Sequence, residues 1–391
     1  MTFSVADVNH RLSAGTVSVG FEAVRNQFDA YLLADPAYSA QLAVYLNGEL
    51  VVDLAGGPDL AEDSVTGVFS VSKGISALVI ATLIRDGALA LDETVAHYWP
   101  EFGAAGKDRI TVRQLLSHQA GLVGVPGGLA FEELRDSSVA AARLAAAFPD
   151  WRPGSDFGYH GITIGVFMEE LTRRITGRTL QETYESEIRA PHDIDFYLGL
   201  PATAEPRFRE VLPMAPTSAQ QAEIDRHASA PDGLTALAFN SPLRGDSVVD
   251  SPISPNRRES RAAGLAAVSG VGSARGLAKA YATAIGAAGR PPLLDPGTIA
   301  QVAQQQVRGL DRVLNKTMCF GIVYMKPHQE VEFASYRAFG HDGAGGGLGF
   351  ADPAYNIGFG YIPMPIPFPG AADPKGVHLS QIVRSCIRLR G

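Results

Sequence analysis

The chain has 391 residues, of which 46% are hydrophobic and 19% charged, a composition typical of an ordinary globular protein. Its formal charge of −8 argues against a nucleic-acid or anionic-membrane partner, which would need a basic face. Two cysteines are too few for a disulfide framework or a cysteine-ligated metal site, and no apolar run reaches the ~18 residues of a membrane span. Residues 1–7 lack the features of an export signal, so we expect a cytoplasmic protein.

Hydrophobic periodicity predicts the elements of the first half of the chain. Residues 21–33 carry apolar side chains at helical spacing. Two β-rich runs, 39–46 and 49–55, are joined by Asn47-Gly48, the strongest short signal for a β-hairpin. An apolar helical run over 70–84 follows, and we expect it to pack on the sheet of that hairpin. Further helices are expected over 110–120 (starting at Thr111), 131–148 and 161–176.

The second half returns from helix to sheet. Residues 201–262 are irregular and predict long loops, some of which would cover a site. Helix is expected over 262–288, and another helix runs to Val307 with Asp295 as its cap and Pro296 at its first position. Strands are expected over 318–325, 331–339, 348–352 and 356–361, and a closing helix is expected over 378–388.

This order predicts an α/β (α+β) fold with an antiparallel sheet flanked by helices. Residues 1–85 and 255–391 would form the α/β domain, and residues 86–254 a mostly helical inserted domain with long loops. An active site would lie at the interface of the two.

A Ser-x-x-Lys sequence opens the helix expected over 70–84. Residues three apart share one face of a helix, so the Ser70 hydroxyl and the Lys73 ammonium would meet there. A helix N-terminus also favours the negative charge that forms on an attacking serine oxygen. The alternative is that Ser70 only caps the helix and Lys73 is a solvated charge.

Tyr159 is a second candidate, in the loop before the helix expected over 161–176. A tyrosine can serve as a general base if a cation lowers its pKa from the ordinary value of about 10. Lys73 would supply that cation. The alternative is a packed aromatic ring with a satisfied hydroxyl.

A third signal is the glycine-rich stretch after His341 and Asp342. Residues 343–347 contain four glycines between two expected strands, which implies a backbone that bends sharply or approaches another group closely. The stretch departs from the phosphate-binding G-x-G-x-x-G pattern, because Leu348 occupies its last position. We expect a strand edge whose N–H groups face a substrate, with His341 donating a hydrogen bond. Alternatively, His341 is structural.

Two other hydrolase patterns are absent from the sequence. There is no G-x-S-x-G, so the chain lacks the nucleophile elbow of an α/β-hydrolase. There is no H-E-x-x-H, and the nine histidines show no metal-ligand spacing. No metal or cofactor is therefore expected.

The order and spacing of these motifs resemble the serine β-lactamase and penicillin-binding-protein superfamily. The closest resemblance is to its class C β-lactamase-like branch, which includes the family VIII carboxylesterases. It spans about residues 20–365 and is strengthened by residues 115–122 (LLSHQAGL), which are similar to the LLxHxSGL element of that branch. The matching residues are Ser70, Lys73, Pro153, Gly154, Phe157, Tyr159, His341 and Gly343.

The resemblance implies a role for each matching residue. Ser70 would accept the acyl group, Lys73 would activate Ser70, and Tyr159 would be the general base. The backbone N–H groups of Ser70 and Ala344 would form the oxyanion hole. We expect His118, within the LLSHQAGL stretch, and its neighbour Gln119 to be structural.

Two departures from the β-lactamase pattern favour an esterase. Gly161 stands where class C β-lactamases have the asparagine of Tyr-x-Asn, and it offers no side-chain amide. His341 replaces the lysine of Lys-Thr-Gly, and histidine is mostly neutral at pH 7. Gly161, His341 and Gly343 would thus border a substrate site that suits a small neutral ester better than a carboxylated peptide.

The sequence therefore predicts a cytoplasmic serine carboxylesterase that hydrolyses esters of short to medium acids through an acyl-enzyme. The alternatives are a β-lactamase, DD-peptidase, D-aminopeptidase or acyltransferase of the same fold and, outside the enzymes, a non-catalytic penicillin-binding-like module. Its partner would be a small-molecule ester, and a homo-oligomer is left open. Met364, Ile366 and Phe368 would form either an exposed contact patch or a tail packed on the core.

Overall fold

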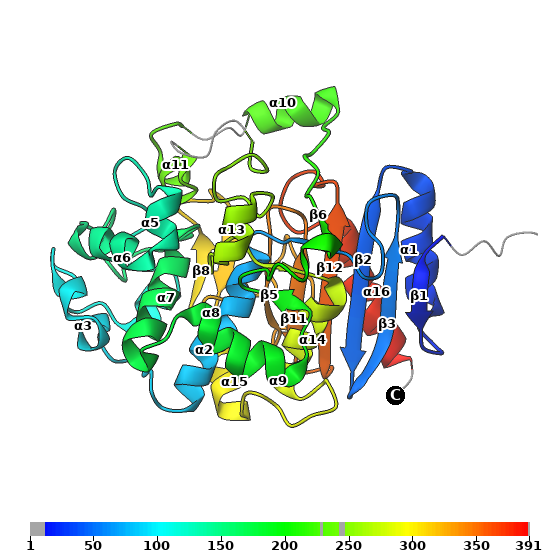
Figure 1. The fold of residues 1–391 in the computed structure, drawn as a ribbon, viewed down its shortest axis with the longest axis horizontal. Coiled ribbons are helices and arrows are strands. Elements are labelled where there is room, and N and C mark those ends of the chain that lie inside the picture. Colours follow the sequence, from blue (N-terminus) through cyan, green and yellow to red (C-terminus); the bar gives the residue numbers. More distant parts are fainter. Residues whose placement is uncertain (1–11, 227–229, 242–246, 390–391) are drawn as a thin grey trace, which may run out of the picture.

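One antiparallel sheet joins the two ends of the chain (Figure 1). The computed structural model describes residues 12–226, 230–241 and 247–389, and within these residues the sheet has six strands in the order β1-β3-β2-β12-β11-β10. Their bounds are β1 Ala14–Val17, β2 Ser39–Leu46, β3 Glu49–Gly56, β10 Phe339–Asp342, β11 Leu348–Asp352 and β12 Ile357–Met364. The predicted Asn47-Gly48 hairpin is confirmed, with positive φ angles at both turn residues.

Helices cover both faces of this sheet. Helices α1 (Glu22–Ala34) and α16 (Pro374–Arg388) pack on one face, and α14 (Ala274–Ile285) and α2 (Val71–Arg85) pack on the other (Figure 1). β12 is buried along its whole length. Two of its glycines allow α14 to approach closely, because a Cβ atom at Gly358 would lie 2.4 Å from the Ala278 carbonyl oxygen.

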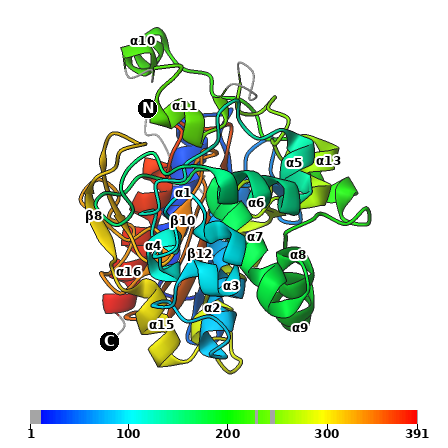
Figure 2. The ribbon, with the colours of Figure 1, turned by 90° about the vertical axis from the view of Figure 1, so that its left-hand side faces the viewer.

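A layer of helices lies beyond α2, on the side seen in Figure 2. Most of the remaining helices of the described residues are short, and loops separate them. Their bounds are α3 Val95–Tyr98, α4 Val112–Leu116, α5 Phe131–Arg135, α6 Ser137–Ala146, α7 Thr163–Thr176, α8 Leu180–Thr183, α9 Ala190–His192, α10 Ser218–Arg226, α11 Leu234–Ala238, α13 Arg258–Ala263 and α15 Pro296–Ala303. Two small sheets complete the described fold. The first has the strand order β5 (Phe196–Tyr197), β7 (Val271–Gly272), β4 (Val65–Gly67) and β6 (Phe208–Arg209). The second pairs β8 (Val307–Leu310) with β9 (Thr317–Phe320).

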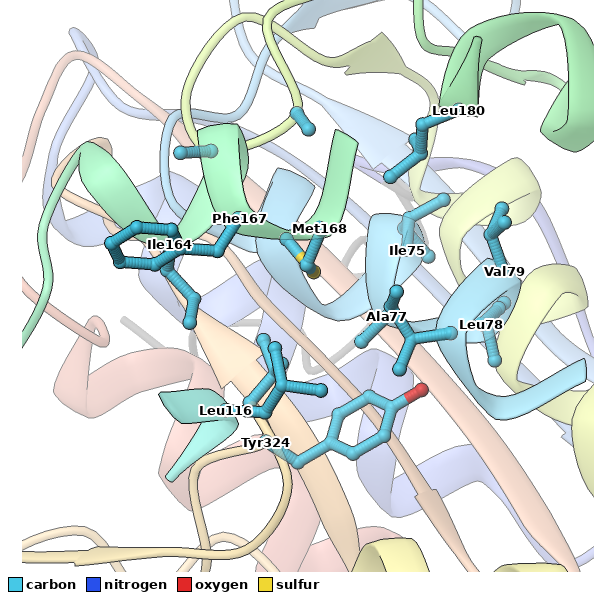
Figure 3. Packing of buried hydrophobic residues seen from close by; sticks show 14 of the residues in the cluster. Ile75, Ala77, Leu78, Val79, Leu116, Ile164, Phe167, Met168, Leu180 and Tyr324 are labelled. Carbon is cyan, nitrogen blue, oxygen red and sulfur yellow. The ribbon is translucent and has the colours of Figure 1, made fainter. Parts of the chain in front are cut away.

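α2 is the most enclosed helix at the centre of the molecule. Every residue from 71 to 84 is buried, as expected of a helix that is apolar on all sides. Figure 3 shows Ile75, Ala77 and Leu78 of α2 beside Phe167 and Met168 of α7, with the ring of Tyr324 below them. This packing fixes the N-terminus of α2, where Ser70 stands.

The segment 262–288 is not one helix, contrary to the sequence prediction. α13 ends at Gly264, which has φ +65°, and the strand β7 intervenes before Ser273 caps α14. The abundant alanine favours helix, but the glycine C-cap and the serine N-cap interrupt it. The helix that Asp295 caps also ends earlier than expected, at Ala303.

The strand predicted over 331–339 is wrong as well, and the one over 318–325 is only β9. The N–H and hydroxyl of Ser335 donate to the Asp352 carboxylate, at 2.8 and 2.6 Å. Val331 pairs with His328 in an isolated bridge, and a regular strand begins only at Phe339.

The segment after β12 packs on the protein. Met364 and Ile366 are 1% and 5% exposed, which supports the packed tail over the contact patch. The division into residues 1–85 with 255–391 and residues 86–254 stays a prediction. Residues 1–7 lie outside the described residues, as do 227–229 and 242–246 of the loop region. None of the helices in the described ranges combines the length and apolarity needed to cross a bilayer.

We predict that Gly358→Ala destabilises the protein by about 1–3 kcal/mol, because the added methyl group overpacks the contact between β12 and α14. Urea unfolding measures the effect. Gly103→Ala is the matched control, since its Cβ would meet only ordinary contacts at 3.4 Å or more. Equal midpoints for Gly358→Ala and the wild type would contradict the tight packing described.

Candidate active site

Ser70 stands where the loop after β4 enters α2. Phe69, just before it, has φ +49°, an uncommon conformation for a non-glycine residue that marks a sharp turn. The Ser70 side chain makes no capping hydrogen bond, and its Oγ instead accepts a hydrogen bond from Lys73 Nζ at 2.9 Å. The interpretation of Ser70 as a mere helix cap is therefore wrong.

Lys73 is completely buried, so the solvated-charge alternative is wrong too. Its Nζ donates to Ser70 Oγ and, at 2.8 Å, to the carbonyl oxygen of Ala267. Burial lowers the pKa of Lys73 from 10.5 to about 7, although the negative charge of Asp342 opposes the shift. Near pH 7 a large share of Lys73 is thus an uncharged amine, which can accept a proton.

Tyr159 lies against the same amine. Lys73 Nζ is 5.0 Å from the centroid of the Tyr159 ring, and the Tyr159 hydroxyl is hydrogen-bonded to Ser70. Burial raises the pKa of Tyr159 above its ordinary value, and Asp342 and Asp311 raise it further. The expectation that Lys73 lowers the Tyr159 pKa is therefore wrong, because the site is dehydrated and its amine has given up much of its charge.

The loop that carries Tyr159 is held by buried polar side chains. Asp311 Oδ1 accepts the backbone N–H of Tyr159 at 3.1 Å and two further backbone N–H groups at 2.8 Å. His118 accepts the N–H of His160 at Nδ1 and that of Gly158 at its carbonyl. His118 thus acts on the loop backbone, as a structural residue would.

His341 borders the site from β10, with its ring centroid 6.0 Å from that of Tyr159. It is 1% exposed, and burial holds its pKa below the ordinary value, which confirms that it is neutral at pH 7. Nδ1 must donate to the Asp342 carbonyl oxygen at 2.7 Å, so Nε2 carries a lone pair. The expected hydrogen-bond donor is therefore an acceptor, and it has no partner among the described residues.

Two backbone N–H groups stand free beside Ser70. The chain passes so close to the nucleophile at Gly343 that a Cβ atom there would lie 2.4 Å from the Val68 carbonyl oxygen and 3.3 Å from the Ser70 nitrogen. Within residues 12–226, 230–241 and 247–389, neither the Ser70 N–H nor the Ala344 N–H donates a hydrogen bond. Both are available to an oxyanion.

Gly161 faces a segment that fills the space beside it. A Cβ atom at Gly161 would lie 2.6 Å from the carbonyl oxygen of Ala238, the last residue of α11. Phe239, which follows, places its ring 6.0 Å from that of Tyr159. The loop region thus occupies the place where an asparagine side chain would extend.

Three contributors to the site escaped the sequence prediction. Ala267 acts through its backbone carbonyl, which any residue has, so no sequence signal exists for it. Asp311 is 152 residues from Tyr159, and Ala238 and Phe239 lie in a segment without a motif. Across the described part of the chain, no three His, Cys, Asp or Glu side chains come together as a metal site would require.

The chain is similar to known proteins over most of its length. Residues 28–363 match the family model described as Beta-lactamase. The chain belongs to the β-lactamase family. EstA from Arthrobacter nitroguajacolicus Rue61a is 49% identical with a TM-score of 0.89, over 96% of this chain and 99% of EstA.

Two further proteins that are similar to this chain carry functional names. A family VIII carboxylesterase is 30% identical with a TM-score of 0.79, over 96% of this chain and 99% of that structure. The esterase/beta-lactamase LipL of Mycobacterium tuberculosis is 32% identical over 350 residues, 82% of this chain and 76% of LipL. The resemblance to the family VIII branch and the predicted fold are confirmed.

We predict that Asp311→Ala destabilises the protein by about 3 kcal/mol or more, because three buried N–H groups lose their acceptor. Asp311→Asn keeps one oxygen in place and should lose at least about 1 kcal/mol less. Urea unfolding of the two variants gives the comparison. Equal losses would show that the three hydrogen bonds do not hold this loop.

Proposed function

We propose that the protein is a serine carboxylesterase that hydrolyses esters of short to medium acids through an acyl-enzyme on Ser70. The observation that carries the proposal is Ser70 Oγ, 2.9 Å from a buried amine whose pKa is about 7 and beside two free backbone N–H groups. The names of the carboxylesterase and of LipL support the reaction class.

Acylation starts with the uncharged amine of Lys73. Nζ takes the Ser70 hydroxyl proton while Oγ bonds to the ester carbonyl carbon. The carbonyl oxygen becomes an oxyanion, which the N–H groups of Ser70 and Ala344 stabilise. Because Tyr159 keeps its proton, Lys73 replaces Tyr159 in the role of base that the sequence suggested.

Tyr159 acts in the next step as a proton relay. When the tetrahedral intermediate collapses, the bond to the alcohol breaks and the leaving oxygen takes the Tyr159 hydroxyl proton. The Lys73 ammonium returns a proton to Tyr159, so Lys73 is again neutral. Water then attacks the acyl-enzyme by the same route, yields the acid and restores Ser70.

The surroundings favour esters over β-lactams. Ala238 leaves no room for an amide side chain at Gly161, and neutral His341 offers no cation to a substrate carboxylate. The name of LipL keeps β-lactam hydrolysis as the second candidate. The cytoplasmic location stays a prediction, and the oligomeric state stays open.

We predict fast hydrolysis of p-nitrophenyl acetate, butyrate or octanoate, with nitrocefin slow or silent. Ser70→Ala should lower ester kcat/KM by at least about 10³-fold, because it removes the nucleophile. Ser155→Ala, at an exposed serine, is the matched control and should keep full activity. Fast nitrocefin with weak esters would make the β-lactamase alternative the better one. Silence on all four substrates would favour the binding module.

We predict that ester kcat/KM falls about tenfold per pH unit below pH ~7 and levels off above it, because the base must be unprotonated. Lys73→Arg, which holds its proton at every accessible pH, should lose at least about 10²-fold in kcat/KM. Initial rates with p-nitrophenyl butyrate from pH 5.5 to 8.5 test both. A profile that is flat through pH 7 would show that Lys73 is not the base.

A further inference from the structure

Helix α15, which lies at the lower edge of the view in Figure 1, lines a second cavity. Its volume is about 510 Å³, within the size range of small-molecule pockets. α15 and the end of α14 supply an apolar wall that includes Ile285, Ile299 and Ala303. None of the residues placed around Ser70 lines it, so it is separate from the candidate active site.

The charges at this cavity are all of one sign. Lys326 and Arg337 line it, and no Asp or Glu among the described residues does. Lys326 is 4% exposed, and its Nζ donates to the Ala338 carbonyl oxygen. Neither cation forms an ion pair within the residues that the structure describes. No carboxylate among the described residues lies within ion-pair distance of either cation, so an anion that enters the cavity can pair with both.

Lys326 is mostly cationic near neutral pH. Burial lowers its pKa from 10.5 to about 8, while the nearby Cys319 and Asp352 act in the opposite direction. The amide side chain of Gln304 lines the same cavity and supplies a further hydrogen-bond donor, whereas Asn356 Nδ2 already donates to Asn47 Oδ1 at 2.7 Å. The cavity thus offers charge and donors next to an apolar wall.

We propose that this cavity binds an aliphatic carboxylate. The carboxylate group would pair with Lys326 and Arg337, and its chain would lie along Ile285, Ile299 and Ala303. The apolar wall favours such an amphiphilic anion over inorganic phosphate, and the two cations favour it over the corresponding alcohol. The site is independent of ester hydrolysis, so a protein without its nucleophile can test it.

The test is calorimetric titration of the Ser70→Ala protein at pH 7 with sodium octanoate, octan-1-ol and inorganic phosphate. We expect octanoate to bind at least tenfold more tightly than either of the others. The absence of octanoate binding would overturn the proposal. Equal affinity for octan-1-ol or for phosphate would overturn the assignment to an aliphatic carboxylate.

Variants in the same background locate the ligand. Lys326→Met should weaken octanoate binding about tenfold and Arg337→Gln about threefold, whereas Ala300→Trp should abolish it by filling the cavity. Arg226→Gln, at an exposed arginine on α10, is the matched control and should change nothing. If Lys326→Met does not fold, Arg337→Gln and Ala300→Trp, both at exposed positions, decide the question. Binding that survives both would place octanoate elsewhere and overturn the proposal.

Discussion

The chemistry depends on an amine that is held in a dry core without a carboxylate partner. Water would keep Lys73 protonated, and a proton-bearing Lys73 could not serve as a base. The helix that carries it is buried from residue 71 to residue 84, and α2 packs against α7 one turn further along (Figure 3). The Ala267 carbonyl binds the amine without adding a negative charge, so its pKa stays near the pH at which the enzyme would work.

The same lack of water sets the protonation states of the groups around the amine. Tyr159 keeps its proton and His341 stays neutral, because each would have to carry a charge in a place that cannot solvate it. Polar groups are satisfied mainly by the backbone, as with Asp311 beneath the Tyr159 loop. Apart from the Asp342 carboxylate, the site carries little charge, which suits a neutral ester whose charge appears only when the oxyanion forms.

Substrate selection rests on a part of the chain that is irregular in sequence. α11 ends against Gly161 and brings Phe239 to Tyr159, so a loop segment takes the place of a β-lactam-binding amide. The exclusion is steric, since a bulkier residue at Gly161 would meet a backbone carbonyl rather than a side chain that can move aside. The proposed preference for esters thus rests both on the segment that fills the site and on the amide side chain that Gly161 lacks.

The sequence by itself determined the contact of Ser70 with Lys73, the hairpin and the family, because these depend on local spacing: three residues along one helix, two residues in one turn. It also indicated that both ends of the chain contribute strands to the sheet. Only the tertiary structure showed that Lys73 is buried, that His341 Nε2 is free to accept, and that Asp311, Ala267 and Ala238 lie at the site. Protonation follows from burial, and burial arises from segments far apart in the chain, so no local pattern encodes it. The strand expected over 331–339 is absent for a similar reason. Ser335 in this segment donates to the distant Asp352 side chain, a contact that no local pattern predicts.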